Sequence, residues 1–151
     1  MLQIVRYLGV RRVLDIEIAK NDVRKKGFAL SVVKDGNTIL QSKTPGVSAL
    51  VTAIERDRQS LRGASAADKV LGRAAAMLFV YSEVKCVFAL LASQDALTTL
   101  KMFSVPFECE KTVARVLNRN QTSTCPFESL IQDVEDPQDA FEKLKICKIG
   151  H

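Results

Sequence analysis

Two β-rich runs flank the dipeptide Asp35-Gly36. The runs Phe28–Lys34 and Asn37–Ser42 combine branched and aromatic residues, which favour strands over helices. An Asp-Gly pair readily adopts the positive φ angles that a two-residue turn between antiparallel strands requires. The sequence therefore predicts a β-hairpin over residues 28–42.

Helical patterns lie on both sides of this hairpin. Asp15–Lys26 has apolar residues at helical spacing and ends in basic residues before Gly27, as helices commonly do. Val47–Arg58 contains a second helical stripe. Ser65–Asp68 has the pattern of a capping box. We therefore expect Lys69–Ser82 to form the central buried helix.

The second half of the chain alternates strand and helix patterns. The continuous apolar run Cys86–Ala92 is typical of a strand covered on both faces. Ser93 is expected to cap a helix over Gln94–Phe103. A short strand over Phe107–Glu110 and a helical stretch over Thr112–Leu117 are predicted next.

Two further helices are predicted to begin at Cys125-Pro126 and Asp136-Pro137, because proline is favoured in the first helical turn.

The order of elements predicts an α/β fold with three layers, α/β/α. Its mixed sheet would carry the N-terminal hairpin and have helices on both faces. We expect a basic extension over residues 1–14, one domain over 15–145 and a tail over 146–151.

The charge of the chain is concentrated at its N-terminus. The net charge is +5, and the first 26 residues contain seven basic residues against three acidic ones. Aromatic residues make up only 6% of the chain, and tryptophan is absent. A nucleic-acid-binding surface would spread Lys and Arg over a face and interleave them with stacking aromatics. The composition therefore argues against general nucleic-acid binding.

Residues 1–14, MLQIVRYLGVRRVL, are basic and apolar. This composition is typical of an organelle-targeting segment or of a membrane-surface helix. The stretch lacks serine and a small-residue cleavage site, which favours an extension or a packed element in a cytoplasmic protein, with organelle targeting as the alternative. No apolar run in the chain approaches the ~18 residues of a membrane span.

The cysteines do not form a metal-binding pattern. Cys86, Cys109, Cys125 and Cys147 are separated by 23, 16 and 22 positions, and His151 is the one histidine. Zinc ligands usually come in closely spaced pairs. We therefore expect no metal and no cofactor, and free thiols in a reducing compartment.

Cys125 is the candidate nucleophile, because the N–H groups at a helix start favour a thiolate. Asp68, Lys69 and Glu128 are its candidate proton-transfer partners, since no second histidine exists to act as a base. Glu128 would equally serve as a helix cap, and a lone cysteine is often a small buried apolar residue. The residues alone leave both interpretations open.

A polar loop supplies candidate ligand-binding residues. Residues 118–124 contain six amide or hydroxyl side chains, and we single out Asn118, Asn120, Thr122 and Thr124. Helix N-termini at Asp68 and at Cys125 are expected to converge beside the carboxyl ends of the strands, where open α/β sheets bind ligands. Such a pocket would suit an anion or a polar heterocycle.

Several strings together resemble one family. VVKDGNTILQS, ADKVLGRAAAMLFV and NRNQTSTCPFE followed by DPQDAFEKL are similar to the domain-of-unknown-function family numbered eighteen ninety-three. The similarity runs from about residue 15 to 145. That family is placed within the cytidine-deaminase-like superfamily, so the resemblance implies a cytidine-deaminase-like version of the α/β/α fold.

The resemblance implies a fold and a pocket position but not an activity. Members of the wider superfamily hold zinc with His-x-Glu at one helix start and Pro-Cys-x-x-Cys at the next. This chain has Ala66-Ala67-Asp68 and Cys125-Pro126 instead, so only one acid and one thiol match. Deamination through a zinc-bound hydroxide is therefore not expected.

Three functions remain. The first is zinc-independent binding of a nucleotide or related small molecule at two helix N-termini. The second is a metal-independent enzyme that uses Cys125 as nucleophile on a nucleoside-like substrate. The third is a structural or interaction protein with a vestigial pocket, whose basic N-terminal segment binds an acidic partner or a membrane. Apolar sheet edges would support a homodimer.

Overall fold

A five-stranded mixed sheet forms the centre of the computed structural model, which describes residues 2–117 and 124–149. The strand order is β2-β1-β3-β4-β5. β1 is antiparallel to β2 and β3, whereas β3, β4 and β5 are mutually parallel. The strands are β1 (Leu30–Lys34), β2 (Asn37–Ser42), β3 (Ser65–Leu71), β4 (Cys86–Ser93) and β5 (Phe107–Val113).

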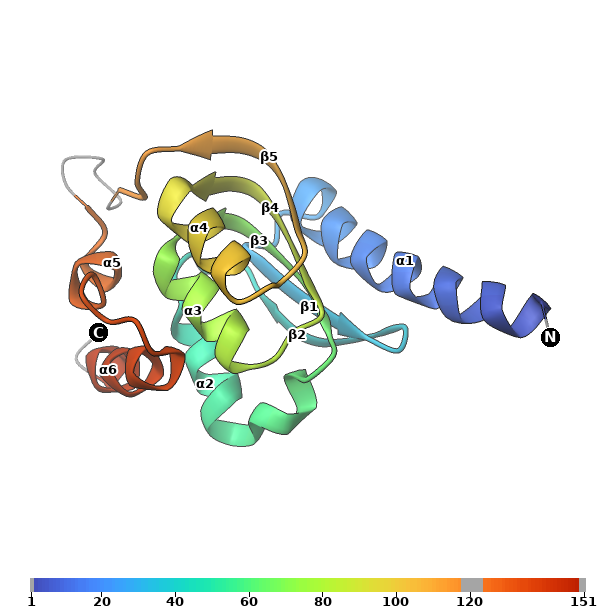
Figure 1. Ribbon diagram of the computed structural model, residues 1–151, viewed down its shortest axis with the longest axis horizontal. Coiled ribbons are helices and arrows are strands. Elements are labelled where there is room, and N and C mark those ends of the chain that lie inside the picture. Colours follow the sequence, from blue (N-terminus) through green and yellow to red (C-terminus); the bar gives the residue numbers. More distant parts are fainter. Residues whose placement is uncertain (1, 118–123, 150–151) are drawn as a thin grey trace.

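Helices cover both faces of this sheet, which confirms the predicted three-layer α/β/α architecture. α1 lies on one face, and α2, α3 and α4 lie on the other (Figure 1). α5 and α6 lie at the end toward which the arrows of β3, β4 and β5 point. The helices are α1 (Leu2–Lys25), α2 (Ser48–Asp57), the 3₁₀ helix η1 (Arg58–Leu61), α3 (Arg73–Tyr81), α4 (Gln94–Met102), α5 (Pro126–Leu130) and α6 (Pro137–Ile149). Within the described chain, none of these helices has the length and apolar character needed to cross a bilayer.

The predicted hairpin is confirmed as β1 and β2. Asp35 and Gly36 both have positive φ angles, 53° and 80°. The carboxylate of Asp15 on α1 accepts hydrogen bonds from the backbone N–H groups of Asp35, at 3.0 Å, and Gly36, at 2.8 Å. The turn is thus fastened to the helix that covers it.

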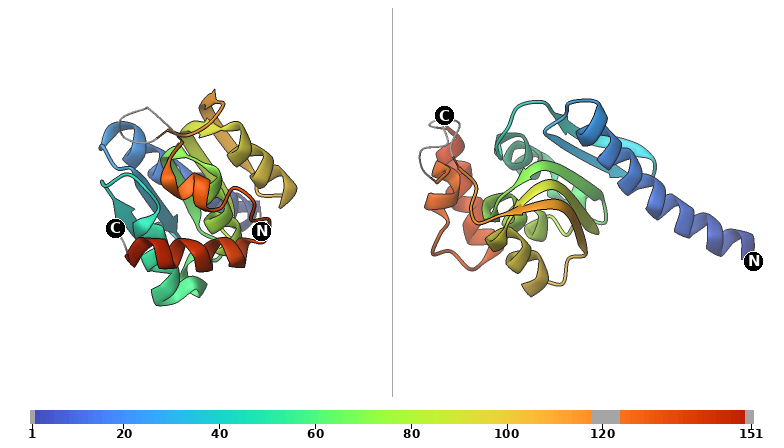
Figure 2. Two further views of the ribbon diagram at one scale, coloured as in Figure 1. Left: turned by 90° about the vertical axis from the view of Figure 1, so that its left-hand side faces the viewer. Right: turned by 90° about the horizontal axis from the view of Figure 1, so that it is seen from above.

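α1 packs on the sheet through its C-terminal half. Ala19 and Val23 are buried against Val33, Ala67 and Phe88 of the three inner strands. The N-terminal half of the helix extends beyond the body of the domain, as the right-hand view of Figure 2 shows. The expected boundary between an extension and the domain at residue 14 therefore falls inside one continuous helix.

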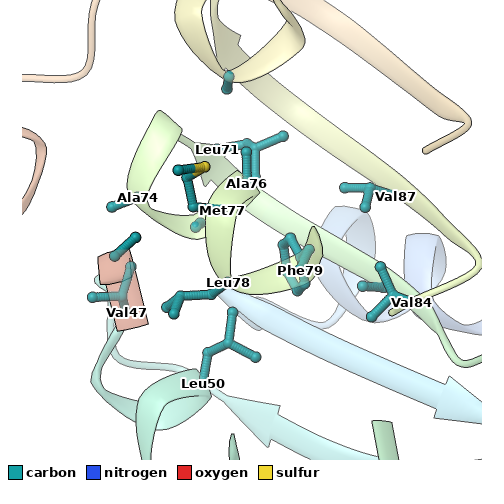
Figure 3. Close-up of a cluster of buried hydrophobic side chains, with 14 of the residues drawn as sticks. Val47, Leu50, Leu71, Ala74, Ala76, Met77, Leu78, Phe79, Val84 and Val87 are labelled. Carbon is teal, nitrogen blue, oxygen red and sulfur yellow. The ribbon is translucent and has the colours of Figure 1, made fainter. Parts of the chain in front are cut away.

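The larger part of the core lies on the opposite face. α3 contributes six consecutive buried residues, 74–79, and its Met77, Leu78 and Phe79 are fully buried (Figure 3). Leu50 of α2 and Val87 of β4 belong to the same cluster. An apolar helix of this kind is stable only when other elements surround it.

One predicted helix start is wrong. Ser65–Asp68 is not a capping box but the first half of β3, and the helix begins at Arg73 after Gly72. β3 pairs with β1 on one side and with β4 on the other. These backbone bonds on two sides override the helical preference of alanine, lysine and leucine, which is only a weak local bias.

The region after α4 also differs from prediction. The capped helix at Ser93 is confirmed, but the predicted short strand over Phe107–Glu110 extends to Val113. Thr112–Leu117 is not helical. Pairing with β4 continues through Val113, so hydrogen bonding between the strands again determines that these residues are extended.

Candidate functional site

Two neighbouring parallel strands pass directly into helices at the same edge of the sheet. β3 ends at Leu71, and Gly72 is the N-cap of α3. β4 ends at Ser93, whose hydroxyl caps α4 by accepting a hydrogen bond from the Ala96 amide at 3.1 Å. The N-termini of α3 and α4 therefore lie next to each other, with their partial positive charges at the carboxyl ends of the strands.

A cavity of about 250 Å³ lies at this edge. The segment after β5 and the region of α5 supply its remaining walls. All but one of its lining side chains are polar. They are Arg73, Ser93, Asp95, Arg115, Val116, Thr124, Glu128 and Gln132.

Glu128 caps the N-terminus of α3 from a different element. Both carboxylate oxygens lie 3.2 Å from the Ala74 amide nitrogen. A side chain at Gly72 would be 2.0 Å from one of these oxygens, so the carboxylate occupies the space that the glycine leaves. Burial raises the pKa of Glu128, while hydrogen bonds from the Ala74 and Arg73 amides and the positive charge of Arg73 act in the opposite direction.

Arg73 makes a second connection between α3 and the chain around α5. Its Nη1 donates to the Ile131 carbonyl at 2.6 Å, and its Nη2 donates to the Val134 carbonyl at 2.5 Å. The first residue of α3 therefore fixes the chain that follows α5. Together, Glu128 and Arg73 form a reciprocal connection between α3 and the segment around α5.

Asp68 lies on β3 and is partly buried. The Val70 amide donates to its Oδ1 at 3.3 Å. Burial raises the pKa of Asp68 to about 8, and the negative charge of Glu128 adds to the increase.

A family model for a domain of unknown function, DUF1893 (TM1506), matches residues 18–146. This chain belongs to the DUF1893 family. The resemblance inferred from the sequence motifs is confirmed, and the matched range agrees with the expected one.

Solved structures resemble this DUF1893 chain. The crystal structure of a DUF1893 family protein from Thermotoga maritima superimposes with a TM-score of 0.78 and 26% sequence identity, covering 86% of this chain and 87% of that chain. RibD from Acinetobacter baumannii gives a TM-score of 0.44 and 22% identity over 64% of this chain and 33% of that chain. No curated protein sequence matches this chain. The wider cytidine-deaminase-like placement stays a prediction.

Two of the predicted site residues of this DUF1893 chain line the cavity, and three others that the structure describes do not. Thr124 and Glu128 line it, whereas Asp68, Lys69 and Cys125 do not. Asn118, Asn120 and Thr122 lie outside the described residues.

The candidate nucleophile directly precedes a short helix. Cys125 is the N-cap of α5, as predicted, and is partly buried. Its backbone N–H donates to the Val116 carbonyl at 3.1 Å. Within residues 2–117 and 124–149 its sulfur has no hydrogen-bonding partner. Lys69 is exposed on β3, and its backbone N–H donates to the Ala29 carbonyl.

Five polar lining residues were not among the predicted site residues. The sequence does not mark Arg73, because the capping-box pattern over Ser65–Asp68 predicts that it lies inside a helix over Lys69–Ser82 and not at a helix start. Ser93 is predicted as a cap, and a cap directly after a buried strand is a signal for such a site. Asp95 in the first turn of α4 shares that signal. Arg115 and Gln132 carry no local signal, since only the fold brings them to this edge.

The zinc of the wider superfamily does not fit the residues present. Across the part of the chain that the structure describes, no three His, Cys, Asp or Glu side chains come together to hold a metal ion. Glu128 is already engaged by the α3 amides, and Asp68 lies on a strand rather than at a helix start. We therefore derive no chemistry through zinc.

Proposed function

We propose that this chain is a binding domain for a nucleotide or a related small polar molecule, held in the cavity between the N-termini of α3 and α4. The observation that carries this proposal is the polar lining of a cavity at the carboxyl ends of two parallel strands. Ligands bind at this position in open α/β sheets, because helix N-termini and loop side chains converge there.

The size of the cavity favours a small ligand. Its volume of about 250 Å³ is below the ~300–1,000 Å³ range of pockets for drug-sized molecules. A nucleobase, alone or with its sugar, is the part of a nucleotide that suits such a space. A phosphate would then lie toward the opening.

The lining offers both kinds of hydrogen-bonding partner. Arg115 supplies donors, Asp95 supplies acceptors, and the Gln132 amide supplies both. Two arginines and two acids give the lining formal charge balance. A planar nitrogen heterocycle, which carries donors and acceptors on one edge, is complementary to this set.

Ligand binding to the purified full-length chain tests this proposal. Isothermal titration with nucleosides and nucleoside 5′-monophosphates is expected to identify at least one ligand. Arg115→Ala and Gln132→Ala should each weaken its binding roughly tenfold, because each removes one polar contact. The exposed Arg56 and Gln138 lie away from the cavity, so Arg56→Ala and Gln138→Ala are matched controls.

Two results would overturn the proposal. One is the absence of binding by every nucleoside and nucleotide at millimolar concentration. The other is binding that Arg115→Ala and Gln132→Ala leave unchanged, since the ligand would then occupy another place on the molecule.

A further inference from the structure

We propose that the segment Thr124–Val134, which carries α5, is a strap over the cavity and that the Glu128 carboxylate is its latch. The strap lies at the end of the sheet toward which β3 and β4 point (Figure 1), and α5 faces the viewer in the left-hand view of Figure 2. The gating role of the strap rests on the proposed function, whereas the latch is a property of the protein without ligand.

The strap is part of the cavity wall. Thr124, Glu128 and Gln132 are lining residues, one before, one within and one after α5. Movement of residues 124–130 away from α3 would remove Thr124 and Glu128 from the wall, while Gln132 would stay beside the buried Ile131. The cavity would then open toward solvent on that side.

The helix in the strap has little packing of its own. α5 has five residues, and none of them is buried. Phe127 is only partly buried against the core, and Leu130 is 39% exposed. A single helical turn without a buried apolar face is not stable in isolation. Polar contacts therefore add to the packing of Phe127 in holding α5 against α3.

Four of the polar contacts of the strap are made with the start of α3, and the Cys125 amide donates to the Val116 carbonyl. Glu128 accepts hydrogen bonds from the amides at the start of α3, and Arg73 binds the carbonyls of Ile131 and Val134. Ile131 and Val134 are buried, so the C-terminal end of the strap has an apolar anchor. Around Glu128 only the partly buried Phe127 packs on the core, so loss of the Glu128 contact would loosen the middle of the strap while the anchor stays in place.

Gly72 provides a specific way to test the latch. The Glu128 carboxylate occupies the space of a side chain at this position, with the Val116 methyl group next at 3.2 Å. The φ angle of Gly72 is −101°, which any residue adopts. Gly72→Ala should therefore act by expelling the carboxylate and not by straining the backbone. Its effect should vanish once Glu128 has been shortened to alanine.

Hydrogen–deuterium exchange on the ligand-free full-length chain tests the latch. We expect peptides from 124–134 to exchange at least about tenfold faster in Gly72→Ala and in Glu128→Ala than in the wild type, whereas peptides from β4 keep their protection. The double variant should exchange no faster than Glu128→Ala. Glu135→Ala, at an exposed acid next to the strap, is the matched control and should behave as the wild type.

Two exchange results would overturn the latch. In one, Gly72→Ala and Glu128→Ala leave peptides from 124–134 as protected as they are in Glu135→Ala. In the other, the two substitutions act additively, which would mean that Gly72 does not work through Glu128. Loss of protection in β4 would indicate global unfolding, and the milder Glu128→Gln then takes the place of Glu128→Ala.

Association kinetics of adenosine 5′-monophosphate test the gate. Stopped-flow measurements are expected to give a faster association rate for Glu128→Gln than for the wild type, because the closed strap delays entry. If the nucleotide binds at equal rates to both, the strap is not a gate. If neither nucleosides nor nucleotides bind, the proposed function fails and the gate with it, while the exchange data still decide the latch.

Discussion

The Oδ2 atom of Asp22 on α1 lies 2.7 Å from the Ser31 hydroxyl on β1, which donates a hydrogen bond to it. The Gln41 side chain on β2 donates to the same oxygen at 3.0 Å. Asp22 is 2% exposed and Ser31 is fully buried. One carboxylate thus joins α1 to both strands of the hairpin, in addition to the apolar contacts of Ala19 and Val23.

Asp22→Ala is expected to lower the free energy of unfolding by about 2–4 kcal/mol. The substitution leaves the buried Ser31 hydroxyl without its acceptor, and an unsatisfied buried polar group is costly. Urea denaturation of the full chain measures the effect. Asp133→Ala, at an exposed acid, is the control. A loss no larger than that of the control would show that the apolar contacts alone hold α1 on the sheet.

The raised pKa of Asp68 predicts that the stability of the domain falls as the pH rises. Its pKa is raised from 3.8 to about 8 in the folded protein, so the folded state binds more protons than the unfolded state between these values. The contribution of Asp68 to the free energy of unfolding should therefore be largest at about pH 4 and below. It should then decrease toward pH 8, by at most about 1.4 kcal/mol per pH unit for one proton.

Asp68→Asn separates this effect from other titrations. The neutral side chain keeps an acceptor for the Val70 amide but has no charge to bury. Thermal unfolding between pH 5 and pH 8 should show a flatter dependence in the variant than in the wild type. Part of the slope should persist, because burial also raises the pKa of Glu128. Equal slopes in the two proteins would contradict the assignment.

Local signals were sufficient for much of the fold. Asp35-Gly36 predicted a turn because few dipeptides accept two positive φ angles, and Ser93 predicted a cap because its hydroxyl bonds only within its own turn. β3 lacks a local signal of this kind. Ala66 and Ala67 carry no strand preference, and what makes them a strand is pairing with β1 and β4.

The same distinction explains the site. The place of Glu128 near a helix start suits a proton-transfer partner of Cys125 or a cap of its own helix, but the helix that it caps is α3, 54 residues away. Cys125 does begin α5 as predicted. Arg115 follows β5 and reaches the cavity only because β5 lies beside β4. No spacing within the sequence encodes such contacts, so they become visible only with the topology.

Cys125 is expected to alkylate no faster than the other three cysteines in the folded protein. All four are partly buried, and within the described residues no polar group contacts the Cys125 sulfur. Iodoacetamide labelling at several pH values, with mass spectrometry of the peptides, measures the four rates. The hypothesis of a catalytic thiol predicts the reverse. Selective labelling of Cys125 near neutral pH would support that hypothesis and justify a search for substrates.

Removal of residues 1–14 is expected to leave the domain folded, with a change in melting temperature below about 4 °C. The described buried side chains of α1 lie at Asp15, Ala19, Asp22 and Val23, and the family match begins at residue 18. Calorimetry of the truncated chain measures this.

Removal of residues 1–24 is the contrasting variant, because it deletes the Asp22 contacts and exposes Phe88, and it should unfold the domain. A large loss of stability on removing only residues 1–14 would mean that the N-terminal half of α1 contributes to the fold through contacts within the chain or with a second copy. Sedimentation of the intact protein would distinguish these two explanations, because only the second requires a dimer.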